Sequence, residues 1–141
     1  MKKIQFTKKY LIRFSHCDPA GIVYFPQYLI LTNWLVEDWF TEGLEINFAE
    51  FIGSRRLGLP IVKLECEFLR PSRQGDNLSF FLQMVNLGRS SLELEIEGHS
   101  GSELRLRSNQ IMVFTSLDSG KAISIPDDIR ATLNPEKELI V

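Results

Sequence analysis

The chain has 141 residues, with 16 Lys and Arg against 18 Asp and Glu, so it is close to electrically neutral. This length predicts one domain with one hydrophobic core, covering residues 1–141. The balanced charge and the lack of a basic run argue against a nucleic-acid partner.

The chain is expected to begin with a half-buried strand over residues 5–14, ending at Ser15. Apolar side chains at positions 6, 10, 12 and 14 share one parity, and polar side chains occupy the other. A long helix follows, because Pro26 suits the first helical position and Gly43 suits a C-terminal cap. Its apolar residues cover most of its circumference, so we expect other elements to envelop it: Tyr28, Leu31, Trp34, Leu35, Trp39 and Phe40.

The rest of the chain reads as a short helix and then a series of strands. Asn47 and Glu50 have capping-box spacing, which predicts a helix over residues 48–52. Alternation with a period of two predicts strands from Pro60 to Arg70-Pro71 and over 77–87, 91–97 and 103–116, then a short piece over 123–125 and a helical turn from Pro126. Short turns between long strands predict an antiparallel sheet of five or six strands. Such a sheet wrapped around one long apolar helix is an α+β fold.

Several kinds of segment and site are not expected. The most apolar stretch, residues 28–40, is broken by polar residues and falls short of the ~20 apolar residues of a membrane span. The N-terminus lacks a signal-peptide pattern, so we expect a cytoplasmic protein with no membrane partner. Cys17 and Cys66 are expected to be free thiols. No His or Cys pair has zinc-ligand spacing, so no metal is expected.

The most informative segment is the turn before the long helix, His16-Cys17-Asp18-Pro19-Ala20-Gly21-Ile22-Val23-Tyr24-Phe25-Pro26. A helix N-terminus presents unpaired N–H groups and a partial positive charge, which stabilise negative charge developing on a carbonyl oxygen. A carboxylate beside that point can attack the carbonyl or activate water. His16 is adjacent to Asp18, but neighbours in an extended segment point to opposite faces, so we interpret His16 as structural.

This turn and the strands around it resemble the hotdog-fold acyl-CoA thioesterases, in the branch similar to 4-hydroxybenzoyl-CoA thioesterase. The Asp-x-x-Gly-x-Val-Tyr pattern is the distinctive part, and Leu59-Pro60-Ile61-Val62, Arg70-Pro71 and Gly88-Arg89-Ser90-Ser91 agree with it. The resemblance implies hydrolysis of an aryl- or short-chain acyl-CoA, with 4-hydroxybenzoyl-CoA among the candidates, to the free acid and coenzyme A. It implies that Asp18 is the nucleophile or general base and that the Phe25 backbone N–H binds the oxyanion. Gly21 gives the substrate room to approach. No cofactor is implied, because coenzyme A is part of the substrate.

Other residues are candidates for substrate binding. Arg89, Ser90 and Ser91 either hold a coenzyme A phosphate or form a solvated turn, and Arg70 and Arg73 are weaker candidates for the same task. Substrate contacts are also expected from Tyr24, Pro60, Ile61 and Val62. Asn33 either bonds the acyl group or faces a second subunit. Hydroxybenzoyl-specific members are expected to carry an acid near this position, so asparagine argues against that particular substrate.

The sequence leaves other functions to be weighed and favours an oligomer. A non-catalytic acyl-CoA-binding module shares the expected fold. An acyl-thioester dehydratase needs a histidine that neither His16 nor His99 supplies, and the nucleophile elbow of a serine hydrolase is missing. Apolar residues lie on the sheet face away from the helix: Leu69, Phe81, Val85, Leu87, Ile111 and Val113. This face favours a second copy, and the resemblance implies a homodimer with two shared sites, commonly paired into a homotetramer.

Overall fold

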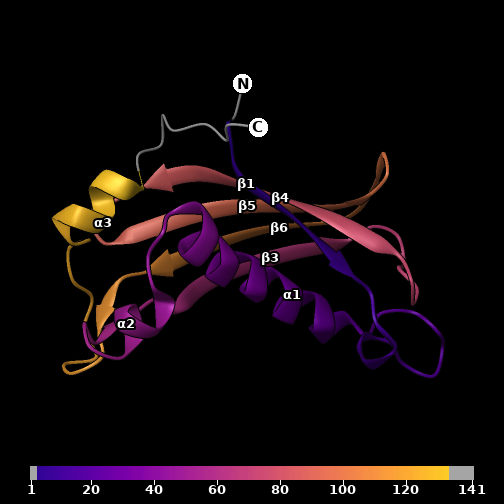
Figure 1. The fold of residues 1–141 in the computed structure, drawn as a ribbon, viewed down its shortest axis with the longest axis horizontal. Coiled ribbons are helices and arrows are strands. Elements are labelled where there is room, and N and C mark those ends of the chain that lie inside the picture. The colour runs from indigo at the N-terminus through magenta and orange to yellow at the C-terminus, as the bar shows by residue number, and fades with distance from the viewer. Residues whose placement is uncertain (1–2, 134–141) are drawn as a thin grey trace.

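The structure is a computed structural model that describes residues 3–133, and it has two layers (Figure 1). One antiparallel sheet has the strand order β1-β4-β5-β6-β3, and the long helix α1 crosses one face of it. These elements are β1 (Ile4–Leu11), α1 (Phe25–Asp38), β3 (Ile61–Phe68), β4 (Asn77–Leu87), β5 (Ser91–Ser100) and β6 (Glu103–Val113). The predicted α+β fold, a five-stranded antiparallel sheet around one long helix, is confirmed.

Smaller elements connect and extend these two layers. They are a 3₁₀ turn (Phe14–His16), a π-helical turn (Trp39–Gly43), α2 (Phe48–Ile52), β2 (Leu57–Gly58), β7 (Thr115–Ser116) and α3 (Asp127–Thr132). The predicted cap of α2 is present, since Asn47 Oδ1 accepts a hydrogen bond from the Glu50 N–H at 3.0 Å. β2 and β7 pair into a small second sheet that the sequence did not predict.

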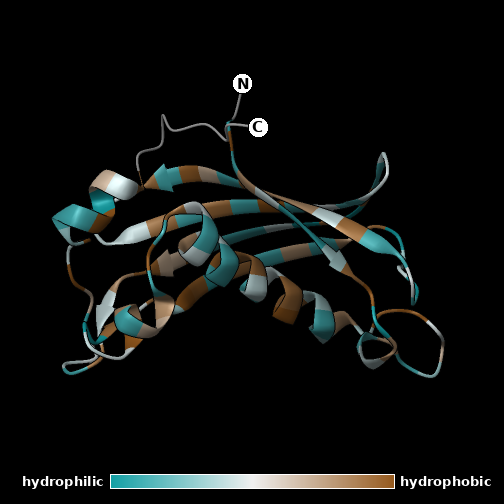
Figure 2. Ribbon diagram, viewed as in Figure 1, coloured by the Kyte–Doolittle hydropathy of each residue, from teal (hydrophilic) through white to brown (hydrophobic). Residues whose placement is uncertain are grey.

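The core lies between α1 and the inner face of the sheet. Leu31 and Leu35 of α1 are fully buried against alternate residues of two central strands: Leu78, Phe80, Leu82, Leu92, Leu94 and Ile96. Figure 2 shows the matching alternation of hydrophobic and hydrophilic residues along the sheet. The period-two prediction is therefore confirmed for β4, whose bounds also agree.

The first strand ends at Leu11, three residues before its predicted end. Phe14, which was predicted to be buried by its parity, is 80% exposed. Ile12 donates its N–H to Asp76 O at 2.8 Å, and a 3₁₀ turn begins two residues later. This turn breaks the alternation, so the parity of β1 no longer places the side chain of Phe14.

The long helix also differs from its prediction. It begins at Phe25, so Pro26 is its second residue, and its last predicted turn is a π-helical turn that ends at Gly43. The helix is not enveloped, because Ile30 and Trp34 are each 42% exposed. One sheet covers one side of a helix, and the side that carries these two residues is only partly covered, with Trp34 against Tyr10 of β1.

The later strands differ mainly at their ends and at the sheet edge. β5 continues three residues past Glu97, and β6 ends at Val113, after which the chain pairs with β2. The piece over residues 123–125 is not a strand of the sheet. β3 is an edge strand, so its alternating apolar residues Val62 and Phe68 remain 61% and 45% exposed. Within residues 3–133, no helix combines the length and hydropathy that crossing a membrane requires.

Candidate active site

Three backbone hydrogen bonds shape the turn that carries Asp18. The Asp18 N–H donates to Ile22 O at 3.0 Å, and the Gly21 N–H donates back to Asp18 O at 2.9 Å. Gly21 has a φ of +82°, a conformation that costs other residues backbone strain. The Tyr24 N–H donates to His16 O at 3.0 Å and closes the segment just before α1. The predicted tight turn therefore directly precedes the start of α1.

The Asp18 side chain is half-buried, and its Oδ1 accepts a hydrogen bond from the Ala20 N–H at 2.9 Å. Two adjoining pockets of about 310 and 320 Å³ share Cys17, Asp18 and Pro19 in their walls. The first pocket is completed by Phe14, Gly21 and Gln74, and the second by Ser15, His16, Tyr24 and Gln27. The carboxylate thus lies where two cavities meet.

The start of α1 leaves one backbone donor without a partner. Pro26 has no N–H, and the N–H groups of Tyr24 and Gln27 donate to His16 O and Tyr24 O. The Phe25 N–H makes no hydrogen bond to any group in residues 3–133. Phe25 is 56% exposed, and its neighbours Tyr24 and Gln27 line the second pocket. An unpaired N–H at a helix start is suited to bind a developing oxyanion.

His16 holds the turn from inside. It is 4% exposed, its Nδ1 accepts a hydrogen bond from the Arg13 N–H at 2.9 Å, and its ring meets the edge of Trp34. Burial, with a smaller contribution from the positive charge of Arg13, lowers the pKa of His16 and keeps the imidazole neutral. These contacts agree with the structural interpretation of His16.

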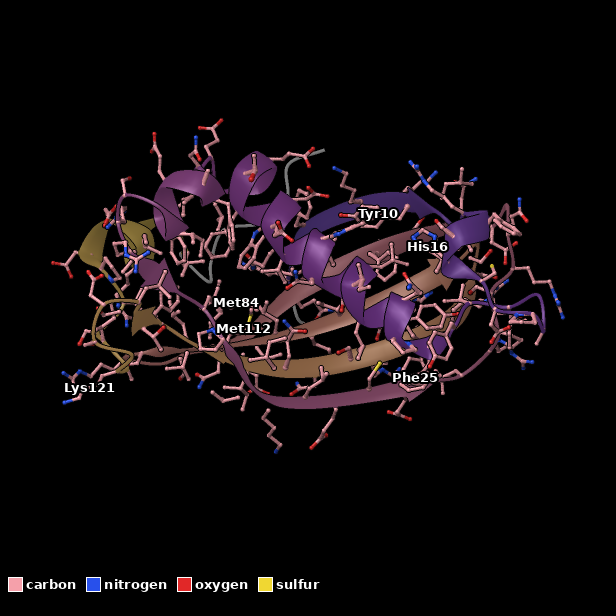
Figure 3. The ribbon with its side chains drawn as sticks, turned by 90° about the horizontal axis from the view of Figure 1, so that it is seen from below. Tyr10, His16, Phe25, Met84, Met112 and Lys121 are labelled. Carbon is pink, nitrogen blue, oxygen red and sulfur yellow. The ribbon has the colours of Figure 1, made fainter. Side chains whose placement is uncertain are left out.

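The other predicted binding residues lie at the opposite end of the chain's fold. Ser91 pairs with Val113, whose N–H donates to Pro60 O at 3.0 Å, so the segments 60–62 and 89–91 are close together. Arg89 Nε donates to Ser124 Oγ at 2.8 Å. β4 runs from the Asp18 end to this second group, and its 11 residues span roughly 30 Å. Figure 3 shows His16 and Phe25 at one end of the molecule and Lys121 at the other.

Asn33 lies between these two groups, on the exposed face of α1. Its Nδ2 donates to Glu37 Oε2 at 3.1 Å, one helical turn further on. Tyr24, by contrast, lines the second Asp18 pocket.

Sequence reasoning missed several residues in the walls of the site. Phe14 was assigned to the core by its parity, and Gln74 is more than fifty residues from Asp18 along the chain. The gap between the predicted strands that end at Arg70-Pro71 and begin at residue 77 indicated a loop at Gln74 but gave no sign of its place in the fold. Within residues 3–133, no three His, Cys, Asp or Glu side chains form a group suited to a metal, and both cysteines are free.

Comparison with known proteins identifies the family. Residues 12–133 match the Thioesterase-like superfamily, and the chain belongs to it. The 1,4-dihydroxy-2-naphthoyl-CoA hydrolase of Nostoc punctiforme is 32% identical over 94 residues, which is 67% of this chain and 63% of that relative. The enzyme of the same name from Synechococcus elongatus is 35% identical over 96 residues, covering 67% of this chain and 68% of that relative. The chain thus spans slightly under two thirds of the first relative's length.

A solved structure agrees on the fold. A 1,4-dihydroxy-2-naphthoyl-CoA thioesterase from Synechocystis superposes with a TM-score of 0.83 at 22% identity, covering 91% of this chain and 94% of that one. At this identity the likeness establishes the hotdog fold, and the chemistry has to be argued from the site itself.

Proposed function

We propose that the protein is an acyl-CoA thioesterase that hydrolyses aryl-CoA thioesters to the free acid and coenzyme A. One observation carries the proposal: the Asp18 carboxylate lies at the junction of two pockets, beside a helix start whose Phe25 N–H is unpaired. Membership of the Thioesterase-like superfamily supports it.

The reaction needs few groups, because a thiolate is a good leaving group. Either an Asp18 oxygen attacks the thioester carbon, or Asp18 takes a proton from a water molecule that attacks it. The carbonyl oxygen becomes negative and binds the Phe25 N–H, and then the C–S bond breaks and the sulfur leaves as coenzyme A thiolate. In the first route, water hydrolyses the resulting anhydride and restores Asp18. Both routes consume one water and give the same products.

The two pockets match the two arms of a thioester, which leave the reacting carbon in different directions. We place the acyl group in the pocket that Tyr24 and Gln27 line, because this pocket adjoins α1. Further along α1 lie Ile30 and Trp34, both half-exposed, and the polar Asn33. An apolar surface with one polar pair suits a hydroxylated aromatic acyl group. The names of the relatives favour the same class, with 1,4-dihydroxy-2-naphthoyl-CoA as the first substrate to test.

A second copy of the chain would complete the site. The residues predicted to bind substrate at positions 60–62 and 89–91 lie at the end of β4 opposite Asp18 of their own chain. β3 is an edge strand with exposed apolar residues, and it runs from Ile61 to Phe68, whose ring lies 6.1 Å from that of Phe25. Antiparallel pairing of β3 with β3 of a second copy would bring each Ile61 end beside the partner's Phe25. We therefore propose a homodimer with two shared sites.

The test is release of coenzyme A thiol from a panel of 1,4-dihydroxy-2-naphthoyl-CoA, 4-hydroxybenzoyl-CoA, benzoyl-CoA and acetyl-CoA. We expect the protein to favour the hydroxylated aryl-CoAs. Asp18→Asn should lower kcat by about a thousandfold or more, because it removes the group that attacks or deprotonates water. Asp118→Asn is the control, since Asp118 is exposed, pairs with Arg56 and is none of the residues proposed to contact the substrate.

Two results would contradict the proposal. Full activity of Asp18→Asn in a folded protein would exclude the assigned role of this carboxylate. Tight binding of aryl-CoA with no release of thiol from any member of the panel would indicate an acyl-CoA-binding module instead.

A further inference from the structure

The loop of residues 71–76, which joins β3 to β4, holds both arms of the Asp18 segment. On the side before Asp18, the Ile12 N–H donates to Asp76 O at 2.8 Å, and the Gly75 N–H donates to Ile12 O at 2.8 Å. On the side after it, the Val23 N–H donates to Ser72 O at 2.9 Å, and Ile22 forms a β-bridge with Arg73. The position of this loop therefore sets where Asp18 and the start of α1 lie.

The loop is mostly exposed and has little core of its own, so polar contacts must fix its shape. Asp76 closes it from within: its Oδ2 accepts a hydrogen bond from the Arg73 N–H at 2.9 Å, and its own N–H donates to Arg73 O at 3.0 Å. The Arg73 N–H and the charge of Arg105 hold the pKa of the Asp76 carboxyl below its usual range. The Asp76 carboxylate therefore lies between the loop backbone at Arg73 and the Arg105 guanidinium.

Arg105 of β6 anchors the loop to the sheet. Its Nη1 lies within hydrogen-bonding distance of Pro71 O at 2.9 Å, Ser72 Oγ at 3.0 Å and Asp76 Oδ2 at 3.0 Å. The Arg105 side chain is only 14% exposed, and its Nε also lies 2.7 Å from Glu103 Oε1. One buried guanidinium thus contacts the loop near its beginning and at its end.

The same cluster reaches the start of α1. Tyr28, in the first turns of the helix, is 4% exposed and stacks on Phe68 with ring centroids 5.5 Å apart. Burial raises the pKa of Tyr28, and the neighbouring Ser72 and Arg105 side chains oppose that rise. Ser72 is fully buried between the guanidinium and the segment that it holds through Val23.

We propose that Arg105 is a positioning residue for hydrolysis: through the loop of residues 71–76 it fixes the distance between the Asp18 carboxylate and the Phe25 N–H. This inference rests on the proposed thioesterase function. Arg105 acts through Ser72 and Asp76 and does not touch the reacting atoms. Gln74 of the same loop lines the first Asp18 pocket, so the loop also forms a wall for the substrate.

The test compares Arg105→Gln and Arg105→Lys with the control Arg55→Gln. Arg55 forms a more exposed pair with Asp128, at 2.7 and 3.0 Å, and joins the loop after α2 to α3. A displacement of about 1 Å at a reacting group can cost a hundredfold in rate. We expect Arg105→Gln to lower kcat by about 10- to 100-fold with a smaller change in KM, Arg105→Lys to recover part of the loss, and Arg55→Gln to keep wild-type kcat.

A second readout does not depend on activity. In hydrogen exchange, the Val23 amide should exchange faster in Arg105→Gln than in wild type, because its acceptor Ser72 O is no longer held. It should be unchanged in Arg55→Gln. If Arg105→Gln does not fold, Asp76→Asn removes the charge partner while keeping an acceptor for the Arg73 N–H, and it should show the same direction of change in kcat and in exchange.

The outcomes separate this inference from the proposed function. Unchanged kcat and unchanged Val23 exchange in folded Arg105→Gln would overturn the positioning role, even where the melting temperature falls. Wild-type protein that cleaves no aryl-CoA would overturn the proposed function. In that case, faster Val23 exchange in Arg105→Gln still supports the role of Arg105 in holding the turn, and unchanged exchange contradicts it.

Discussion

His16 and Tyr24 are joined by a backbone hydrogen bond of 3.0 Å, in which the Tyr24 N–H donates to the His16 carbonyl oxygen. This bond folds residues 17–23 back on themselves and brings Asp18 close to the first residue of α1. It also occupies the Tyr24 N–H, so the Phe25 N–H is the first donor at the helix start that remains free for a ligand. In this turn the Tyr24 N–H closes the segment, and the Phe25 N–H remains free to bind a ligand.

Gly21 offers a direct test of this turn, because its φ of +82° strains any other residue. A Cβ at this position would lie 3.9 Å from Arg73 Nη1, so Gly21→Ala causes strain without collision. Gly120 has a φ of +72° and no atom within 4 Å of its Cβ position, and its neighbour Lys121 lies at the end of the molecule opposite His16 and Phe25 (Figure 3). Both alanine variants should lose about 1–2 kcal/mol of stability, because the backbone strain is similar. Only Gly21→Ala should also lose about tenfold or more in kcat, because only it moves Asp18.

Thermal unfolding and steady-state kinetics on the two variants decide the point. Equal melting temperatures with equal, wild-type kcat would show that the turn tolerates a shift of Asp18. A loss of kcat in Gly120→Ala would show that strain anywhere in the chain affects catalysis, which the geometry does not predict.

The pH dependence of stability should report on His16. Its pKa is lowered in the folded protein below the usual 6.5, first by burial and then by the charge of Arg13. The folded state therefore binds fewer protons than the unfolded state near this pH. The contribution of His16 to stability is full above about pH 6.5 and is lost as the pH falls toward its lowered value.

Chemical denaturation between pH 5 and pH 8 measures this loss. His16→Asn keeps an acceptor for the Arg13 N–H but cannot be protonated, so its stability should fall less on acidification than that of wild type. His99→Asn is the control, because His99 lies on the outer face of the sheet beside Glu97. A decline in His16→Asn as steep as in wild type would assign the pH dependence to other groups.

The sequence predicted the fold well where one signal determines the structure. β4 and α2 have their predicted bounds, because a strict alternation and an Asn47 cap each act within a few residues. Alternation alone does not give the exposure of Phe14 and Val62, because each depends on the pairing of distant segments. Phe14 is turned out by the 3₁₀ turn that begins after Ile12 bonds to Asp76, and Val62 is exposed because β3 is at the sheet edge.

The site, too, contains residues that a local pattern predicts and residues that only long-range pairing brings together. Asp18, Gly21 and Tyr24 fall within one turn and were predicted together; in the structure Gly21 lines the first pocket, Tyr24 the second, and Asp18 both. Gln74 and Arg105 reach this turn only through pairing of distant segments, which no local pattern encodes. Arg89 was placed with Asp18 as part of one site, yet in one chain the two lie at opposite ends of β4.

The exposed edge strand β3 predicts an oligomer. A single substitution in this strand should weaken the association between copies. Val62 is 61% exposed in one chain, so Val62→Glu should leave the fold intact. At a paired β3 edge it would bury a charge or place two like charges close together, which costs several-fold or more in dimer affinity. Sedimentation at micromolar concentration should show a dimer or larger assembly for wild type and a shift to monomer for Val62→Glu. Leu117→Glu, 38% exposed in the turn after β7, should sediment as wild type does.

Subunit complementation tests whether Asp18 and Arg89 of different copies serve one site. Arg89→Gln should raise KM about tenfold, because it removes a charge-assisted hydrogen bond to a phosphate. Asp18→Asn should be nearly inactive. In a dimer that contains one subunit of each variant, one site carries both changes, and the other site has an intact Asp18 and an intact Arg89. Co-expressed chains should therefore regain about a quarter of the wild-type rate at low substrate, well above the mean of the separate variants. A rate equal to that mean would show that each chain uses its own Arg89 or none.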